Sequence, residues 1–237
     1  MVEIEIINLS ALIIFLGCIL VYAIKLKIGM KKPETAKRGL LNIFYGLWVK
    51  RMINKEETII AVQTMRNLIM SATFISSSLL VLLGLLIRVP GNGLGELINL
   101  SATSNEIVAQ YKLLLLLSAS IFSLIMFLLS LRQMVRFSVL IGIPIQDIET
   151  HATKHVENNG NNKNKTCNII DGEALRTDVF LKAMNRFTYG MRGIFYAIAI
   201  ILWFVNVYVF VVSTIILTIL LINFQDIKTP CIEETPI

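Results

Sequence analysis

The sequence predicts an all-α integral membrane protein, and three observations support this fold class. Of the 237 residues, 55% are hydrophobic and 16% are charged, whereas soluble domains carry about 25% charged residues. Four stretches contain no charged residue, namely residues 6–24, 68–87, 113–131 and 194–224. Each is close to the length of about 20 apolar residues that a helix needs to cross a bilayer core. The basic residues collect between these stretches, where they orient membrane proteins.

Four transmembrane helices follow from these stretches, in a single membrane domain. We expect the spans at about residues 4–24, 60–87, 112–133 and 193–223. The first span is preceded by Glu3 and Glu5 and is long. A removable secretory signal has a basic start and a short apolar core, so we expect the first span to stay in the protein.

The distribution of Lys and Arg predicts how the spans are oriented. The connections at residues 25–57 and 132–193 carry nine basic residues each. The connection at residues 88–112 carries two, the N-terminal segment none and the tail only Lys228. Basic connections stay in the cytoplasm, so we expect both termini outside, in the plasma membrane. The same cations can contact anionic membrane lipids, and we expect no nucleic-acid partner.

One or two interfacial helices are expected on the cytoplasmic side. Residues 39–55 are apolar but too short to span, and Tyr45 and Trp48 suit headgroup depth. The alternative is a helix packed on the ends of the spans. Residues 171–187 have apolar positions at helical spacing and predict a surface helix that leads into the fourth span. Residues 145–168, which precede this surface helix, are poor in apolar residues and predict a mobile loop.

Polar residues share a helical face at three places near the expected cytoplasmic ends of the spans. We expect them to converge on an anion or headgroup site, because arginine forks suit phosphate and carboxylate. The alternative is that the arginines extend to lipid headgroups only. The expected site comprises Gln63, Arg66, Asn67, Arg132, Arg136, Asn185, Tyr189 and Arg192. Further polar residues inside the spans are Ser71, Ser78 and Asn206, and the amide of Asn206 should find a partner within the bundle.

The sequence contains no motif that predicts a reaction. His151 and His155 stand four residues apart and are a weak candidate for metal binding, because a third ligand is not evident. We therefore expect no metal and no cofactor, and we identify no catalytic residue. The four uncharged stretches contain no Asp, Glu or His, which disfavours a proton-driven carrier. Cys18, Cys167 and Cys231 lie in different parts of the predicted topology and predict no disulfide.

The residues from Ala61 to Thr73, Ala-Val-Gln-Thr-Met-Arg-Asn-Leu-Ile-Met-Ser-Ala-Thr, resemble a signature of the membrane family called domain of unknown function 599. Trp48-Val49 upstream and the segment from Asn185 to Trp203 downstream are similar to other segments of that family. The Asn-rich insert at residues 157–165 departs from the expected compact loop. The resemblance implies a multi-span membrane protein and adds no activity.

Three functions fit these features. The first is a conduit or carrier for a small anionic or polar solute, with the arginine cluster at its cytoplasmic mouth and polar side chains along the path. Because four helices enclose little space, such a path would run between copies of a homo-oligomer. The second is a structural or accessory subunit of a larger membrane complex, in which the polar faces bind partner helices. The third and weakest is an enzyme acting on lipid headgroups, for which no nucleophile, acid or firm metal site is evident.

Overall fold

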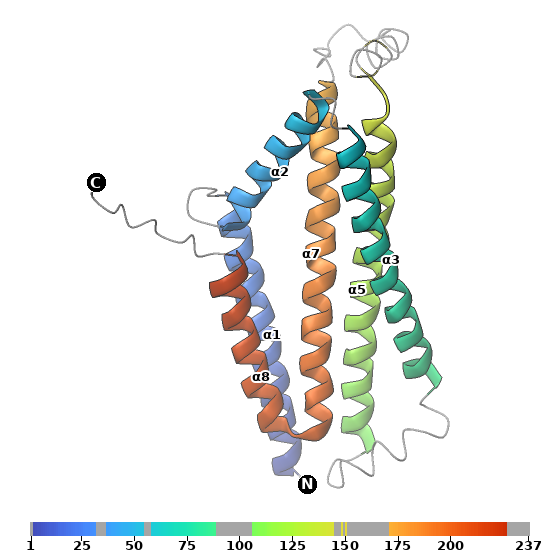
Figure 1. Ribbon diagram of the computed structural model, residues 1–237. Helices are drawn as coiled ribbons and strands as arrows, with labels where there is room; N and C mark the ends of the chain where they lie inside the picture. The colour runs from blue at the N-terminus through green and yellow to red at the C-terminus, as the bar shows by residue number, and fades with distance from the viewer. Residues whose placement is uncertain are drawn as a thin grey trace, which may run out of the picture. The chain divides into compact units, whose positions relative to one another are not determined.

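The computed structural model describes residues 2–31, 37–54, 58–88, 106–144, 148, 150 and 171–226, nearly all of them helical. The helices are α1 (Val2–Lys31), α2 (Lys37–Asn54), α3 (Thr58–Arg88), α5 (Glu106–Ile141), α7 (Gly172–Val205), α8 (Val207–Leu220) and a π-helical turn η1 (Leu221–Asp226) (Figure 1). Four of the helices, α1, α3, α5 and α7, are long and apolar enough to cross a membrane. The predicted all-α membrane fold is confirmed.

Helices cover the first three expected spans. α3 begins at Thr58, near the expected start at residue 60. α5 extends beyond the expected residues 112–133 at both ends and stops at Ile141, just before Pro144, whose ring cannot continue a helix. The interfacial segment forms a helix, α2, as predicted. The mobile-loop prediction and the pair His151 and His155 lie outside the described residues.

Two predictions about the C-terminal third do not hold. The segment at residues 171–187 is not a separate surface helix, because α7 continues through it to Val205 without interruption. The fourth span does not form one helix from 193 to 223, because the chain leaves the helix at Asn206 (φ −160°, ψ 138°) and starts α8 at Val207. The sequence shows no Gly or Pro at this point, so local propensity did not reveal the break.

The described chain divides into two compact units, and α3, α5 and α7 contribute residues to both. Unit 1 comprises Met1–Ile43, Leu79–Leu124 and Gly190–Ile237, and unit 2 comprises Phe44–Ser78 and Ile125–Tyr189. In unit 1, α8 packs along α1, and η1 also packs on α1 (Figure 1). Just before α8 begins, the indole of Trp203 donates a hydrogen bond to Asn8 of α1. Farther along both α1 and α8, the ring of Phe15 packs against the ring of Phe210. The two helices therefore run in the same direction.

Unit 2 has a core of four buried side chains from four helices. Val49 of α2, Met65 of α3, Phe137 of α5 and Phe180 of α7 pack together. A second cluster joins Ala72, Met134 and Ala183. Between the clusters the position on α3 rises from 65 to 72 while that on α5 falls from 137 to 134, so these helices are antiparallel. Small residues at the second cluster allow close packing, and the Ser130 hydroxyl donates a hydrogen bond to the Ala183 carbonyl (2.8 Å).

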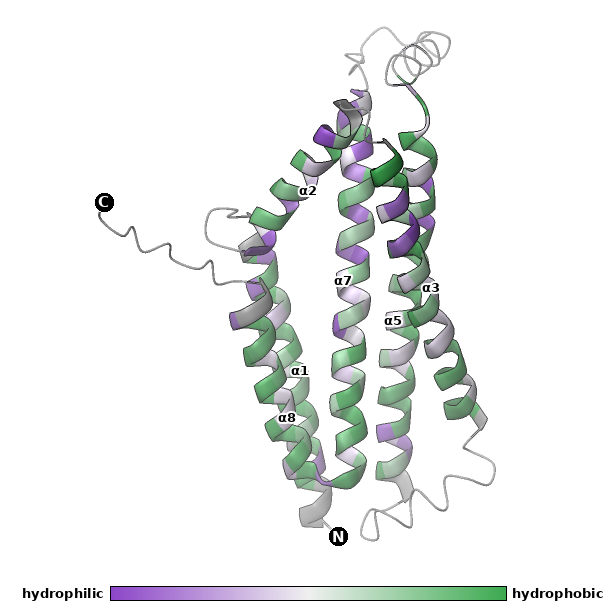
Figure 2. Ribbon diagram, viewed as in Figure 1, coloured by the Kyte–Doolittle hydropathy of each residue, from purple (hydrophilic) through white to green (hydrophobic). Residues whose placement is uncertain are grey.

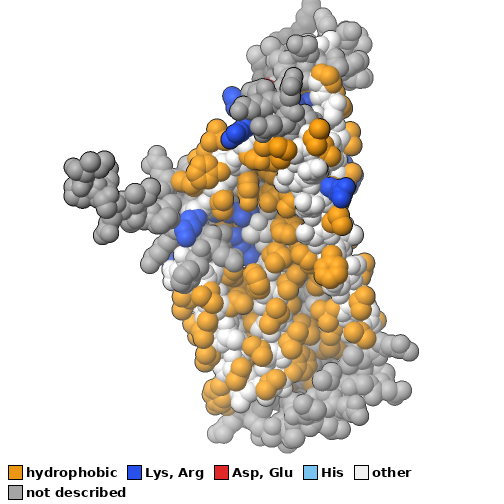
Figure 3. Space-filling view, in the orientation of Figure 1, with side chains coloured by type: hydrophobic (Ala, Val, Ile, Leu, Met, Phe, Trp, Pro, Cys, Tyr) orange, Lys and Arg blue, Asp and Glu red, His pale blue; other side chains and the backbone are white. Residues whose placement is uncertain are grey.

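The outer surface of the helices is mostly apolar. Hydrophobic residues cover most of α1 and α8, whereas α2 and the N-terminal part of α7 carry more hydrophilic ones (Figure 2). The space-filling view shows Lys and Arg side chains as a few separate groups set among hydrophobic ones (Figure 3). Large apolar side chains such as Phe74 on α3 (72% exposed) and Tyr208 on α8 (70% exposed) point outward. Such a surface is stable against lipid rather than water.

Candidate anion site in unit 1

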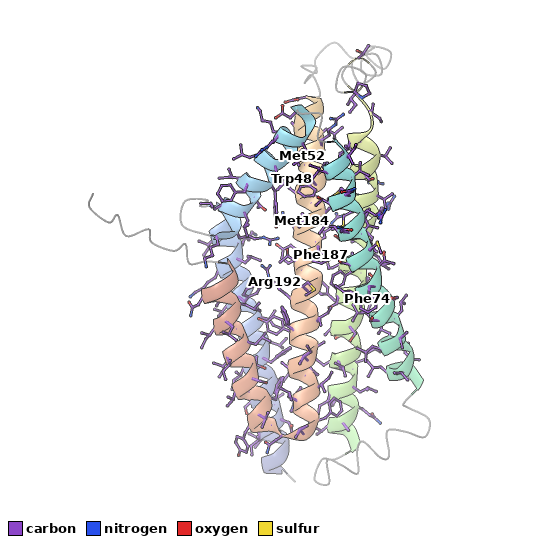
Figure 4. The ribbon with its side chains drawn as sticks, viewed as in Figure 1. Trp48, Met52, Phe74, Met184, Phe187 and Arg192 are labelled. Carbon is purple, nitrogen blue, oxygen red and sulfur yellow. The ribbon has the colours of Figure 1, made fainter. Side chains whose placement is uncertain are left out.

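A buried arginine in the middle of α7 is the centre of the candidate site. Arg192 is 4% exposed and lies 13 residues before the end of α7 at Val205. Its guanidinium carbon is 5.2 Å from the centre of the Tyr22 ring of α1, in a cation–π arrangement. Figure 4 labels Arg192 on the side of α7 toward α1. The electron-rich aromatic face offsets part of the cost of burying this charge.

Aromatic and hydroxyl groups continue the site beyond Arg192. The Tyr196 ring, one turn farther along α7, meets the rings of Tyr22 and Phe15 edge-on, with centroid distances of 6.5 and 5.8 Å. Its hydroxyl lies 3.4 Å from the Thr218 hydroxyl of α8. Thr218 donates its only hydroxyl hydrogen to the Thr214 carbonyl (2.8 Å), so Tyr196 is the donor to Thr218. The hydroxyl oxygen of Tyr196 thus lies in the same buried region as the Arg192 cation.

One turn along α8, a further polar atom has no partner within the part of the chain that the structure describes. Thr214 is fully buried, and its hydroxyl oxygen makes no hydrogen bond to the described residues. Leaving a buried hydroxyl unpaired costs about 1–3 kcal/mol, so a water or a bound polar group would stabilise it. We refer to Arg192, Tyr22, Tyr196, Thr218 and Thr214 as the Arg192 site.

Close helix packing borders the site on the α5 side. A Cβ atom added to Gly193 would overlap the Ser123 hydroxyl of α5. That hydroxyl donates to the Ala119 carbonyl of its own helix (3.0 Å), and Ser120 likewise donates to Leu116 (2.9 Å). These serines therefore need no partner on α7, and they permit α5 and α7 to approach closely.

Arg38 of α2, Lys112 and Arg176 are also buried, and two of these three cations bond to carbonyls near helix ends. Lys112 is 4% exposed and donates to the Trp203 carbonyl (3.2 Å) in the last turn of α7. Arg176, at 2% exposed, donates to the Ile143 carbonyl just beyond the end of α5. Cations suit helix C-terminal ends, where carbonyls lack partners and the helix dipole is negative. Arg192 lies within its helix and has no such role.

The structure places the sequence-predicted residues in different settings. Gln63, Arg66 and Asn67 on α3 are exposed, as are Arg132 and Arg136 on α5. Asn185 and Tyr189 are half-buried in unit 2, while Arg192 is buried in unit 1. Only Arg192 is thus part of a buried polar site that can be described, and the convergence of all eight residues stays a prediction.

The remaining predicted polar residues also have definite positions. Ser71 and Ser78 are on the exposed side of α3 rather than facing inward, and the Ser78 hydroxyl donates to the Phe74 carbonyl (3.0 Å). Among the described residues, the side chain of Asn206 bonds within the turn between α7 and α8 rather than to another helix. It is exposed, and its side chain accepts a hydrogen bond from the Tyr208 amide (2.9 Å), which caps the start of α8.

Sequence reasoning missed Lys112, Tyr22, Thr214 and Thr218. Lys112 was assigned to a loop, but α5 already begins at Glu106 and buries it. Glu106 at the start of this helix was an available signal, because acids favour a first turn. Phe210, Thr214 and Thr218 stand at spacings of four residues, which indicates one helical face. No group of three or more potential metal ligands occurs among the described residues.

A family profile described as "Protein of unknown function, DUF599" matches residues 10–229. The chain belongs to this family. The match extends over nearly all described helices, including the parts of α1, α7 and α8 that form the Arg192 site, and it confirms the family resemblance seen in the sequence. No curated protein and no solved structure matches the chain.

Proposed function

We propose that the protein is a membrane conduit or carrier for a small anionic or polar solute, which binds at the Arg192 site. The observation that carries this proposal is the burial of the Arg192 guanidinium within a membrane-spanning helix. A charged side chain at such a position is expensive, and proteins retain it mainly where it serves a function.

The depth of Arg192 supports the proposal. At a rise of about 1.5 Å per residue, Arg192 lies about 20 Å along α7 from its end at Val205. The hydrocarbon core of a bilayer is about 30 Å thick. If the turn at Asn206 is at the outer boundary, Arg192 is at hydrocarbon depth, about two thirds of the way to the cytoplasmic side.

The chemistry of the site favours an anion with paired oxygen atoms. The planar guanidinium presents donors that match carboxylate and phosphate bidentately. Small carboxylates and inorganic phosphate are therefore the first solutes to test.

We also propose an orientation for the chain. The two connections with nine basic residues each lie in the cytoplasm, so α1 enters it at Lys31. Because α8 and η1 run parallel to α1 over 20 residues, the C-terminus follows them to the cytoplasmic side. This replaces the expectation, drawn from cation counts alone, that the C-terminus lies outside with the N-terminus.

A second function, that of an accessory subunit, is favoured by one observation. Gln63 and Asn67 expose amide side chains on the outer face of α3, and exposed amides on membrane helices commonly bond to a neighbouring helix. A partner subunit or a second copy could supply that helix. Purification in mild detergent separates these cases, because a homo-oligomer fits the carrier and co-purifying foreign subunits fit the accessory role.

Uptake into proteoliposomes tests the carrier proposal. Uptake of labelled inorganic phosphate, succinate and glycerol is compared for the wild type, Arg192→Lys and the control Arg51→Lys, which changes an exposed arginine of α2. We expect the wild type and the control to accelerate uptake of at least one anion. Arg192→Lys should slow that uptake about tenfold or more, since the lysine loses paired hydrogen bonds worth about 1.5–3 kcal/mol. Uptake no faster than in protein-free liposomes for both anions, or an unchanged rate in Arg192→Lys, would contradict the proposal.

A further inference from the structure

Three exposed arginines of unit 2 form a cationic surface that the Arg192 site does not involve. Arg66 lies on α3, and Arg132 and Arg136 lie on α5. We call these three residues the arginine girdle. None of the three makes an ion pair or a hydrogen bond within the described part of the chain, whereas the exposed Lys182 is paired with Asp178 (2.6 Å) and Lys50 with Glu173 (3.3 Å).

The girdle residues are at one level of unit 2. Arg66 directly follows Met65, and Arg136 directly precedes Phe137. Met65 and Phe137 pack in the same buried cluster, so the two arginines leave neighbouring helices at nearly the same height. Arg132 is one helical turn from Arg136. Cations at one height around a membrane protein suit the plane of the lipid phosphates.

Large apolar side chains continue from each arginine in the same direction. On α3, Met70 and Phe74 follow Arg66 at intervals of four residues and are 61% and 72% exposed. On α5, Leu128 and Ile125 precede Arg132 at intervals of four and three residues and are also exposed. Because α3 and α5 are antiparallel in unit 2, both apolar rows extend toward the same end of the unit. Each row thus pairs a guanidinium with a strip of exposed hydrocarbon.

This arrangement has the polarity of a phospholipid molecule. A phosphate can bind a guanidinium through two parallel hydrogen bonds, and the acyl chains can cover the apolar side chains beyond it. We propose that the arginine girdle binds the headgroups of anionic phospholipids in the cytoplasmic leaflet, with the acyl chains lying along the Met70–Phe74 and Leu128–Ile125 rows. The girdle acts as a lipid-binding surface, separate from the solute site.

Lipid titration of purified protein in mixed micelles tests the inference. Phosphatidylglycerol is compared with phosphatidylcholine of the same acyl chains, and bound lipid is counted by native mass spectrometry alongside the melting temperature. The variants are Arg66→Gln, Arg136→Gln and the control Lys182→Gln, which removes one exposed positive charge that already has a partner. Arg66→Lys keeps the charge and loses the planar fork.

We expect phosphatidylglycerol, but not phosphatidylcholine, to raise the melting temperature of the wild type and of Lys182→Gln. Arg66→Gln and Arg136→Gln should bind phosphatidylglycerol about tenfold more weakly, and Arg66→Lys should be intermediate. Only variants that elute like the wild type in size-exclusion chromatography are compared. If a Gln variant does not fold, Arg66→Lys is used to test the role of the arginine.

Three results would overturn the inference. Equal stabilisation by both lipids would mean that headgroup charge is not recognised. Equal stabilisation by inorganic phosphate alone would assign the girdle to a free anion. An equal loss in Lys182→Gln would mean that net charge, rather than the girdle, attracts the lipid. The outcome is independent of solute uptake through the Arg192 site, because Arg192 is unchanged in every variant.

Discussion

At the scale of single residues, Lys112, Arg176 and Arg192 show that similar burial can have different causes. Lys112 and Arg176 each donate to a carbonyl at the C-terminal end of a helix, where a cation is stabilised by the helix dipole. If α7 continued, the Trp203 carbonyl would accept a hydrogen bond from the amide of residue 207, but the chain leaves the helix at Asn206. Lys112 supplies the missing donor. Arg192 satisfies no helix end and packs on an aromatic ring instead.

Gly193 offers a residue-scale prediction about packing beside the Arg192 site. In Gly193→Ala the new methyl would overlap the Ser123 hydroxyl, so we expect a loss of about 1–3 kcal/mol of stability from overpacking. The melting temperature in detergent should fall by several degrees. Ser123→Ala in the same protein removes the overlapping oxygen and should restore most of the loss.

Gly17→Ala is the matched control, because no atom lies within 4 Å of a Cβ at that position of α1. It should leave stability unchanged or raise it slightly, since Ala favours helix over Gly. A Gly193→Ala protein as stable as the Gly17→Ala protein would show that α5 and α7 do not approach closely here.

At the scale of elements, α2 combines both interpretations that its sequence allowed. Tyr45 and Trp48 pack on Phe180 of α7, with ring centroids 5.7 and 5.2 Å from it, so these aromatic residues belong to the core of unit 2. The adjacent face exposes Phe44 and Leu47. The helix is therefore apolar on two sides, one against protein and one free to face lipid.

The hairpin of α7 and α8 leads to an element-scale prediction. Asn206→Ala removes the side-chain oxygen that accepts from the Tyr208 amide, and loss of an N-cap costs about 1 kcal/mol. We expect the melting temperature to fall by about 2–4 °C. Asn206→Asp and Asn206→Ser keep an acceptor and should remain near the wild type. Equal stability of the Ala and Asp variants would mean that the cap does not hold the turn.

At the scale of the whole molecule, the direction of α8 changes the number of passes through the membrane. The chain has four long spans and a fifth helical segment of 20 residues, α8 with η1. About 17–25 residues suffice for a crossing. In the proposed orientation, a fifth pass would put the two ends of the chain on opposite sides of the membrane.

Cysteine labelling tests this topology in cells. Single-cysteine proteins keep only Cys231, only Cys167 or only a new cysteine at Asn92. An impermeant maleimide should label Asn92→Cys in intact cells and should label the other two only after permeabilisation. Labelling of Cys231 in intact cells would mean that α8 turns back or stays at the outer surface, and the C-terminus would then be outside.

Hydrophobic length and charge position determined much of the architecture from the sequence alone. Long uncharged stretches must be helical in lipid because every backbone hydrogen bond has to be made within the segment, and α1, α3 and α5 have the expected positions for that reason. The family resemblance around Arg66 could likewise be read directly from Ala61 to Thr73. Arg192 was selected because its spacing from Asn185 and Tyr189 puts the three residues on one helical face.

Only the tertiary structure decided which polar residues are inside. Helical spacing puts Gln63, Arg66 and Asn67 on one face, but it does not say whether that face meets the core, and Met65 and Ala72 on the other side do. Asn206 is of a residue type that favours helix N-caps, but an asparagine within an apolar stretch does not by itself indicate a turn. The bond from Lys112 to the Trp203 carbonyl, which completes the end of α7, joins residues that are distant in sequence. Burial and helix direction depend on such long-range contacts, and these determine where the chain buries Arg192.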